Sequence, residues 1–279
     1  MEAKKSLGQN FLKDKGILKK IADFAQIEQE DTVVEVGPGE GTLTKLLLER
    51  AKRVVAVEKD ERMVEFLQQK FEQEIAENKL QIITGDVLKL RAESLELRGK
   101  EKGLKASSSK LQAPSYILVG NIPYYITGAL FKKTLESENP PKSLTFVVQK
   151  EVAERIMARE NKESILSISI KAYGIPEYGG VIKAGSFNPK PKVDSAILAV
   201  RSINKKRFEK ITPEKFFEIL RTGFAHKRKL LIKNLGDVPS VSSDTLMLKK
   251  VFDKYGISEK TRAEDLKVEN WFAIARELT

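Results

Sequence analysis

The chain has 279 residues, of which 41% are hydrophobic, a composition ordinary for a globular protein with a sizeable core. It has no cysteine and a single histidine, His226, which excludes disulfides, thiolate metal sites and cysteine nucleophiles and leaves little room for histidine-based metal sites or serine–histidine triads. No apolar run is long enough to cross a bilayer and no signal peptide is recognisable, so we expect a cytoplasmic protein without a membrane partner.

The formal net charge of +11 is distributed unevenly along the chain. Residues 201–233 hold eleven Lys and Arg against three Glu, and residues 1–20 hold six Lys against two acids. A basic excess of this size is typical of proteins with a polyanionic partner, although a solvated Lys/Glu-rich surface has the same composition.

In chain order, short β-branched runs alternate with stretches of helical spacing. The pattern predicts strands at residues 32–37, 53–58, 80–86, 116–121 and 143–149, and helices at 42–51, 60–77, 127–137 and 150–159. This alternation indicates an α/β fold with a parallel sheet and helices on both faces. Residues 181–187 and 195–203 are interpreted as further strands, giving about seven in total with the last one antiparallel.

Beyond residue 203 the strand signal stops and the chain becomes helical. Thr212 is placed to cap a helix that begins at Pro213. We therefore expect two domains, a large α/β domain over residues 1–202 and a small α-helical domain over residues 203–279. Residues 98–114 are basic, Ser-rich and without periodicity, and are expected to form an exposed loop before the fourth strand.

A glycine-rich turn follows the first predicted strand, where doubly wound sheets bind nucleotides. Gly37, Gly39 and Gly41 have the spacing G-x-G-x-G, one residue short of the dinucleotide fingerprint. A tight turn alone would have the same composition. A ligand that approaches the backbone closely without a pyrophosphate, such as S-adenosylmethionine, fits this spacing better than a dinucleotide.

Acidic residues follow the next two strands. Glu58 comes 21 residues after Gly37, where a carboxylate accepts hydrogen bonds from ribose hydroxyls. Asp86 ends the third strand and is expected to face the adenine ring. Each acid taken alone is equally compatible with a helix N-cap or a solvated loop. The three successive strand ends together predict S-adenosylmethionine as the cofactor.

The fourth strand ends in the sequence "NIPY", residues 121–124. The lone pair of the exocyclic amine of adenine is delocalised into the ring. We expect the side-chain oxygen of Asn121 and the backbone carbonyl of Ile122 to accept its two N–H groups, in a turn fixed by Pro123, and to direct the lone pair at a methyl donor. Tyr124 offers a ring on which an extruded base can stack. The alternative is an Asx-turn with its tyrosines packed in the core.

These motifs, with "KKSLGQNFL" at residues 4–12, "VEKD", "GDV" and "FNPKPKVDS" in the same order, resemble the KsgA family of small-subunit rRNA dimethyladenosine transferases over nearly the whole chain. The resemblance implies a Rossmann-like class I methyltransferase fold. It further implies cofactor contacts at Asn10 and Leu12, in addition to Gly37, Gly39, Glu58, Asp86 and Asn121. It also implies that Phe187 lies on the other side of the base from Tyr124.

The substrate implied by the resemblance is a pair of adjacent adenosines in the 3′-terminal hairpin loop of 16S rRNA, each converted to N6,N6-dimethyladenosine during assembly of the small ribosomal subunit. In the basic helical domain, Lys227, Arg228 and Lys229 are the candidate phosphate contacts. No obligate protein partner is inferred.

Two other functions remain open at this point. One is the related Erm type of 23S rRNA adenine methyltransferase, which shares the NIPY-like motif; "GQNFL" and "HKRKLLIKNL" favour the small-subunit enzymes. The other is a catalytically silent RNA-binding assembly or transcription factor on the same fold, against which the intact glycines, Glu58 and NIPY residues argue.

The 98–114 segment is longer than we expect in the family.

Overall fold

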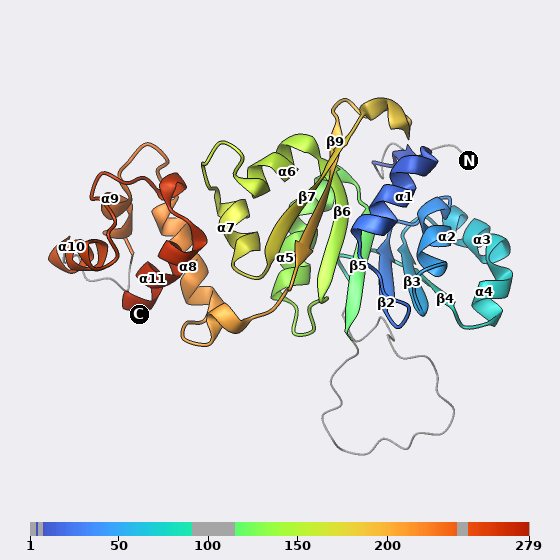
Figure 1. The fold of residues 1–279 in the computed structure, drawn as a ribbon, viewed down its shortest axis with the longest axis horizontal. Helices are drawn as coiled ribbons and strands as arrows, with labels where there is room; N and C mark the ends of the chain where they lie inside the picture. Colours follow the sequence, from blue (N-terminus) through green and yellow to red (C-terminus); the bar gives the residue numbers. More distant parts are fainter. Residues whose placement is uncertain (1–3, 5–7, 91–114, 239–244, 279) are drawn as a thin grey trace, which may run out of the picture. The chain divides into compact units, whose positions relative to one another are not determined.

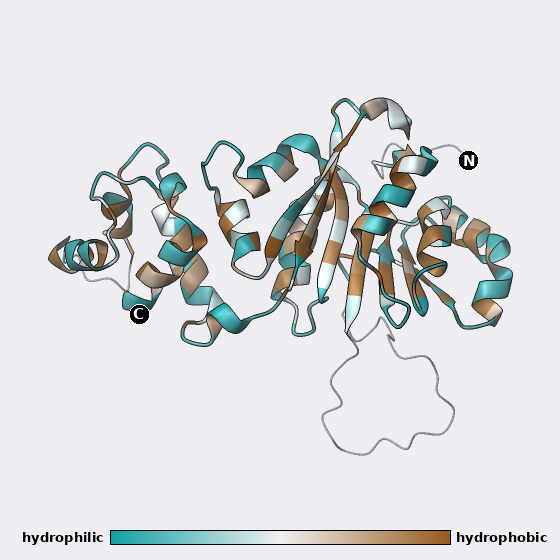
Figure 2. Ribbon diagram, in the orientation of Figure 1, coloured by the Kyte–Doolittle hydropathy of each residue, from teal (hydrophilic) through white to brown (hydrophobic). Residues whose placement is uncertain are grey.

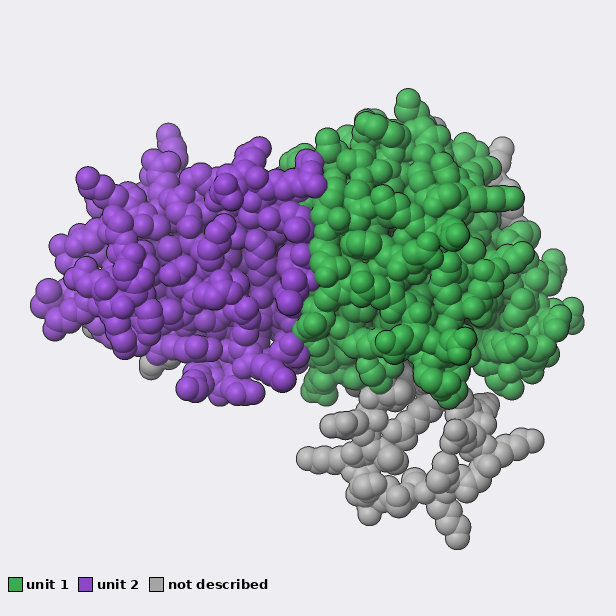
Figure 3. Space-filling model, viewed as in Figure 1, with its two compact units in different colours: residues 1–153, 177–203 green, residues 154–176, 204–279 purple. Residues whose placement is uncertain are grey.

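The computed structural model of the protein describes residues 4, 8–90, 115–238 and 245–278, so the loop expected at 98–114 lies outside the described residues. The chain forms two compact units, shown in Figure 3. The first comprises residues 1–153 and 177–203, and the second comprises residues 154–176 and 204–279. Residues 154–176, placed in the first domain from the sequence, thus group with the C-terminal helices in the contacts that they make.

A seven-stranded sheet forms the centre of the first unit, with the strand order β4-β3-β2-β5-β6-β9-β7 (Figure 1). Neighbouring strands from β4 to β6 pair in parallel, whereas β9 runs antiparallel to β6. The expected mixed sheet with an antiparallel last strand is confirmed. The bounds are β2 (Thr32–Val36), β3 (Arg53–Glu58), β4 (Leu80–Thr84), β5 (Tyr116–Asn121), β6 (Ser143–Gln149), β7 (Ile175–Ile182) and β9 (Ser195–Arg201).

Helices cover both faces of this sheet, so its inner strands are buried on both sides, whereas the edge strands β4 and β7 are partly exposed. Leu18 and Leu47 pack with Val33 and Ile117 on one face. On the other face the rings of Phe131 and Phe146 meet edge to face with centroids 5.5 Å apart. Figure 2 shows the hydrophobic residues concentrated along these strands. The helices are α1 (Lys15–Phe24), α2 (Thr42–Leu48), α3 (Glu61–Lys70), α4 (Glu72–Ala76), α5 (Thr127–Glu136) and α6 (Lys150–Met157).

A second, two-stranded sheet joins the beginning of the chain to a segment far along it. β1 (Phe11–Leu12) pairs antiparallel with β8 (Phe187–Asn188), and the backbone N–H of Lys13 donates to the carbonyl of Ser186. A strand was expected at residues 181–187; the structure instead has β7 earlier and a short helix η4 (Ala184–Ser186) before β8. The half-exposed edge strand β7 contains two glycines, which hid its strand character in the sequence.

The second unit is helical, as expected. Thr212 caps α8 by accepting the N–H of Lys215, and Pro213 is the first helical residue. Trp271 is fully buried in the core of this unit. The helices are α7 (Ile165–Lys171), α8 (Pro213–Gly223), α9 (Leu231–Leu235), α10 (Thr245–Lys254) and α11 (Val268–Glu277), with short 3₁₀ turns η5 (Lys206–Phe208) and η6 (Ala263–Asp265).

Candidate active site

The polar residues selected from the sequence lie at the ends of four neighbouring strands. Gly37 follows β2, Glu58 ends β3, Asp86 follows β4 and Asn121 ends β5. Because these strands are parallel, the four positions meet at the carboxyl edge of the sheet, where the strand order reverses between β2 and β5. They line a common pocket, to which the N-terminal part of the chain adds one wall made by Gly8, Gln9, Asn10 and Phe11.

The glycine turn after β2 has a backbone that other residues rarely adopt. Gly37, Gly39 and Gly41 have φ angles of +69°, +53° and +72°. A Cβ atom at Gly39 would lie 2.8 Å from Cε1 of Phe11, and one at Gly41 would lie 2.5 Å from Cε2 of Phe71. Gly37 and Gly39 line the pocket, whereas Gly41 is required by its φ angle and its close contact with the core.

The carboxylate of Glu58 is held by the turns around it. Its Oε2 accepts the N–H of Gly39 at 3.2 Å, and its Oε1 accepts the N–H groups of Lys59 and Asp60 at 2.8 and 2.9 Å. Burial raises the pKa of Glu58, and the three N–H donors act against this rise. A carboxylate offers about four acceptor positions, so Glu58 retains one for a ribose hydroxyl, on Oε2.

The two carboxylate oxygens of Asp86 also have partners. Oδ1 accepts the N–H of Leu88 at 3.0 Å, and Oδ2 forms an ion pair with Lys59 at 3.0 Å. Burial acts to raise the pKa of Asp86, but these two contacts outweigh it and hold the pKa below its usual value. Lys59 was not selected from the sequence; it lines the pocket and links the ends of β3 and β4.

The amide of Asn121 has a fixed orientation. Its Nδ2 donates to the backbone carbonyl of Asn10 at 2.9 Å. Because a carbonyl oxygen only accepts hydrogen bonds, this contact requires the nitrogen on that side and leaves the Oδ1 atom of Asn121 as an acceptor without a partner among the described residues. Ile122 and Pro123 line the same pocket, and Pro123 has φ −57°. The arrangement therefore provides an acceptor directed away from the N-terminal segment.

Tyr124 begins the short helix η3 (Tyr124–Ile126) and lines the pocket. Its hydroxyl group lies 2.6 Å from Oγ of Ser195, the first residue of β9. Burial raises the pKa of Tyr124, so the side chain is a neutral phenol at physiological pH. The ring is thus anchored at its far end.

Two residues implied by the resemblance do not line the pocket. Leu12 and Phe187 are 4% and 5% exposed and belong to the hydrophobic core, where β1 pairs with β8. Asn10, which the resemblance also implies, lines the pocket together with Phe11. The cofactor contact of Leu12 and the role of Phe187 as the second face of a base sandwich stay predictions.

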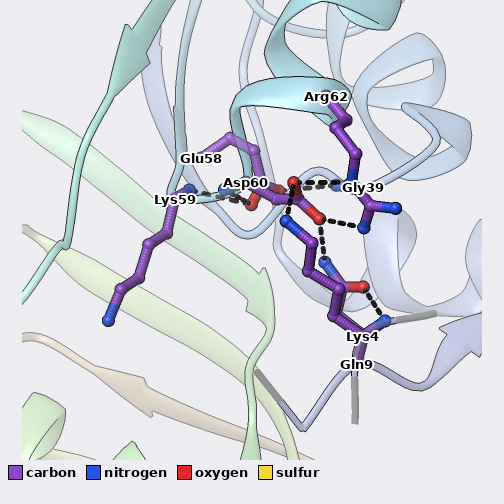
Figure 4. Close-up of polar contacts among 7 residues, drawn as sticks. All are labelled: Lys4, Gln9, Gly39, Glu58, Lys59, Asp60 and Arg62. Atoms are coloured by element: carbon purple, nitrogen blue, oxygen red, sulfur yellow. Dashed lines mark hydrogen bonds and ion pairs between the residues drawn. The ribbon is translucent and has the colours of Figure 1, made fainter. Parts of the chain in front are cut away.

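The N-terminal wall, by which we mean Lys4 and residues 8–11, is attached to the sheet through Asp60, as Figure 4 shows. The Nζ atom of Lys4 lies 3.0 Å from Oδ1 of Asp60, and Nε2 of Gln9 donates to Oδ2 at 3.2 Å. Arg62 forms an ion pair with the same carboxylate at 2.7 Å. Asp60 comes two residues after Glu58 at the start of a helix, so in the sequence it was indistinguishable from an ordinary N-cap.

The three candidate phosphate contacts lie between α8 and α9. Lys227, Arg228 and Lys229 are exposed, and none of them forms an ion pair within the described residues. Asn234 lies beneath this loop, and its Nδ2 donates to the carbonyls of Gly223 and His226 at 2.7 and 3.1 Å. The three positive charges therefore lie on a loop whose backbone is fixed by the hydrogen bonds of Asn234.

Neither a metal site nor a membrane span is found in the described part of the chain. No group of three or more His, Cys, Asp or Glu side chains there could hold a metal ion. No helix in the described ranges is long and apolar enough to span a membrane.

The sequence of the whole chain, residues 1–279, matches the model of the family described as "Ribosomal RNA adenine dimethylase". The chain belongs to this family. The ribosomal RNA small subunit methyltransferase A of Dehalococcoides mccartyi is 37% identical over 271 residues, covering 97% of this chain and 87% of its own length. The enzyme of the same name from Clostridium botulinum is 36% identical, covering 96% and 90%.

Solved structures agree with this assignment. A dimethyladenosine transferase from Plasmodium falciparum has a TM-score of 0.73 at 25% identity, covering 95% of both chains. The 23S rRNA methyltransferase ErmE also has a TM-score of 0.73, at 23% identity, covering 96% of this chain and 99% of its own, which shows the shared class I methyltransferase fold and no more. As a ribosomal RNA adenine dimethylase, this protein is an enzyme whose cofactor is S-adenosylmethionine.

Proposed function

We propose that this dimethylase converts two adjacent adenosines in the 3′-terminal hairpin loop of 16S rRNA to N6,N6-dimethyladenosine. The names of the 36–37% identical relatives support the small subunit as the source of the substrate. The observation that carries the chemistry is the orientation of Asn121, whose Nδ2 is occupied by the carbonyl of Asn10 and whose Oδ1 is free to accept the adenine amine.

The protein contributes orientation and hydrogen bonds to the reaction. Oδ1 of Asn121 and the backbone carbonyl of Ile122 accept the two N–H groups of the adenine amine, which localises its lone pair on N6. The ring of Tyr124 stacks against the extruded base, and its anchored hydroxyl keeps the ring in place. The cofactor would supply the methyl group and leave as a neutral thioether, and each transfer releases one N–H proton of the amine to solvent.

The cofactor contacts follow the strand ends. Gly37 and Gly39 allow close approach to the backbone, Glu58 accepts a ribose hydroxyl at Oε2, and the chain around Asp86 faces the adenine of the cofactor. Asn10 contributes from the N-terminal wall, whose neighbour Leu12 anchors it in the core.

Substrate binding extends beyond the pocket. Residues 1–202 act as the methyltransferase domain, and residues 203–279 bind RNA through phosphate contacts of Lys227, Arg228 and Lys229. Their exposure and lack of ion pairs within the described chain support this role. The partner is the small subunit or its precursor in the cytoplasm, during small-subunit biogenesis, with no obligate protein partner.

A defined reaction tests the proposal. Small subunits that lack the two dimethyladenosines and, in a parallel reaction, unmodified 23S rRNA are incubated with the protein and S-adenosylmethionine, and each rRNA is digested and analysed by mass spectrometry. We expect a gain of four methyl groups in one 3′-terminal fragment of 16S rRNA. Methylation of 23S rRNA instead would indicate the Erm-type activity, and an absence of methylation in either RNA would indicate a silent RNA-binding factor.

A further inference from the structure

We propose that Asp60 is a positioning residue for methyl transfer, acting through the N-terminal wall on the amide of Asn121. The N-terminal wall is defined as Lys4 and residues 8–11. This inference rests on the proposed function, because it assigns a second layer of residues to the same site. It concerns a carboxylate that lies next to the cofactor contacts but does not itself line the pocket.

The hydrogen bonds of Asp60 are unusual for its position. It precedes α3 as the N-cap residue, yet its side chain accepts no backbone N–H from that helix. Its side chain is completely buried and accepts hydrogen bonds from Lys4, Gln9 and Arg62. The carboxylate does not cap its own helix. The hydrogen bonds that compensate the cost of burying its charge therefore come from the N-terminal wall and from Arg62.

A continuous chain of contacts connects Asp60 to Asn121. Gln9 donates to Asp60 and accepts the backbone N–H of Lys4 at 2.7 Å, so two residues of the wall are held by one carboxylate. Asn10 follows Gln9 directly, and its carbonyl accepts the Nδ2 of Asn121 at 2.9 Å. Displacement of the wall would therefore release the amide that it orients.

The charge of Asp60 is what makes this attachment strong. The guanidinium of Arg62, with Lys4 and Gln9, holds the pKa of Asp60 well below its usual range, although burial acts in the other direction. Hydrogen bonds to a charged acceptor are stronger than those between neutral groups. An Asp60→Asn substitution keeps the size of the side chain and removes the charge that attracts the wall.

The variants separate the attachment of the wall from the burial of the acid. Lys4→Met removes an ion pair whose lysine side chain is 44% exposed, so it leaves the core intact. Arg62→Met is the matched control, because Arg62 binds the same carboxylate from α3 instead of from the wall. Each variant is made in the full chain, both in the wild-type background and with Asn121→Ala.

The readout is the single-turnover rate of methyl transfer to under-methylated small subunits, with binding of S-adenosylmethionine measured by calorimetry and folding by thermal unfolding. In the wild-type background we expect Asp60→Asn and Lys4→Met to lower the rate about 10- to 100-fold, because displacement of a reacting group by about 1 Å has effects of this size. Arg62→Met should change it less than threefold. In the Asn121→Ala background we expect the effects of Asp60→Asn and Lys4→Met to disappear.

The outcomes are distinguishable from each other and from failure of the proposed function. Equal losses in both backgrounds would show that Asp60 acts on folding or cofactor binding and would overturn the inference, as would an unchanged rate in Asp60→Asn and Lys4→Met. If Asp60→Asn does not fold, the rate of Lys4→Met in the two backgrounds tests the inference by itself. A wild-type protein that methylates no rRNA contradicts the proposed function before any variant is compared.

Discussion

The hydroxyl group of Tyr124 and Oγ of Ser195 lie 2.6 Å apart, although 71 positions separate them in the chain. This contact links η3, which follows β5, to the antiparallel strand β9. It fixes the ring of Tyr124 at its polar end, and the residue lines the pocket. The position of the ring on which we expect the target base to stack thus depends on both β5 and β9.

The first prediction concerns this ring. Tyr124→Ala should weaken productive binding of the substrate RNA by about 5- to 150-fold, because stacking of one base on an aromatic ring contributes roughly 1 to 3 kcal/mol. Tyr124→Phe keeps the ring and should lose less than Tyr124→Ala. Steady-state kinetics with varied RNA and a fixed, saturating cofactor concentration measures the difference. Equal defects in both variants would contradict a stacking role.

The second prediction concerns the amide acceptor. Asn121→Ala should lower the single-turnover rate by about 100- to 1,000-fold, the usual effect of removing one oriented hydrogen-bonding group at a reacting atom. Calorimetry should show cofactor affinity within a few-fold of the wild-type value, because the glycine turn and Glu58 remain. An unchanged single-turnover rate would show that Asn121 does not take part in methyl transfer.

The third prediction concerns the basic loop between α8 and α9. Replacement of Lys227, Arg228 and Lys229 by Ala should weaken RNA binding and reduce the slope of log K against log salt by about 0.7 to 0.9 for each phosphate that the variant no longer neutralises. A control with Lys52→Ala and Lys79→Ala removes two exposed charges that precede β3 and β4, at the edge of the sheet opposite the pocket. Binding curves at several salt concentrations decide; identical slopes in the basic-loop variant and the wild type would exclude these contacts.

The fourth prediction concerns the buried amide beneath that loop. Asn234 is 1% exposed and donates to the carbonyls of Gly223 and His226, and the His226 carbonyl also accepts the N–H of Lys229. Asn234→Ala removes the side-chain donor of the Gly223 carbonyl and should destabilise the protein by about 1 to 3 kcal/mol. Its exposed neighbour Lys233 provides the control, and Lys233→Ala should change stability by less than about 0.5 kcal/mol. Urea unfolding measures both.

The fifth prediction concerns pH. Burial raises the pKa of Glu35 to about 8, and its Oε2 has no hydrogen-bond partner in the described part of the chain. In the unfolded chain the pKa is about 4.5. Between these values the unfolded chain releases a proton that the folded chain retains, so stability falls as the pH rises towards 8 and then levels off.

Glu35→Gln removes this proton release. From pH 6 to pH 9 we expect the wild type to lose roughly 3 kcal/mol more stability than the variant, at about 1.4 kcal/mol per pH unit below the folded pKa. Urea unfolding across this range measures the difference. A constant difference between the two proteins would show that Glu35 does not titrate there.

Much of the first unit could be predicted from local sequence. The strands β2, β3, β5 and β6 are buried on both faces, and each is followed by a turn and a helix, so the strand pattern and the turn signals of the sequence point to the same elements. The strand ends carry the site, and parallel pairing brings Gly37, Glu58 and Asn121 together once the alternation is recognised.

The N-terminal wall could not be predicted in this way. The contacts of Lys4 and Gln9 with Asp60 span 56 and 51 positions, and nothing in the local pattern distinguishes Asp60 from a helix cap. Nor does the sequence show that Leu12 and Phe187 are buried against each other in paired strands, since both are apolar residues beside polar ones. Both the contacts of Asp60 and the burial of Leu12 and Phe187 depend on residues that are distant in the sequence.

The pairing of β1 with β8 sets an order of events for a newly made chain. The strand that anchors the wall of the pocket has its partner at residues 187–188, near the end of the first unit. While translation is still upstream of that point, the wall has no strand to add to, and the glycine turn stands open on one side. The pocket is therefore completed only after residue 188 has been made, and cofactor uptake is favoured from that point of synthesis onwards.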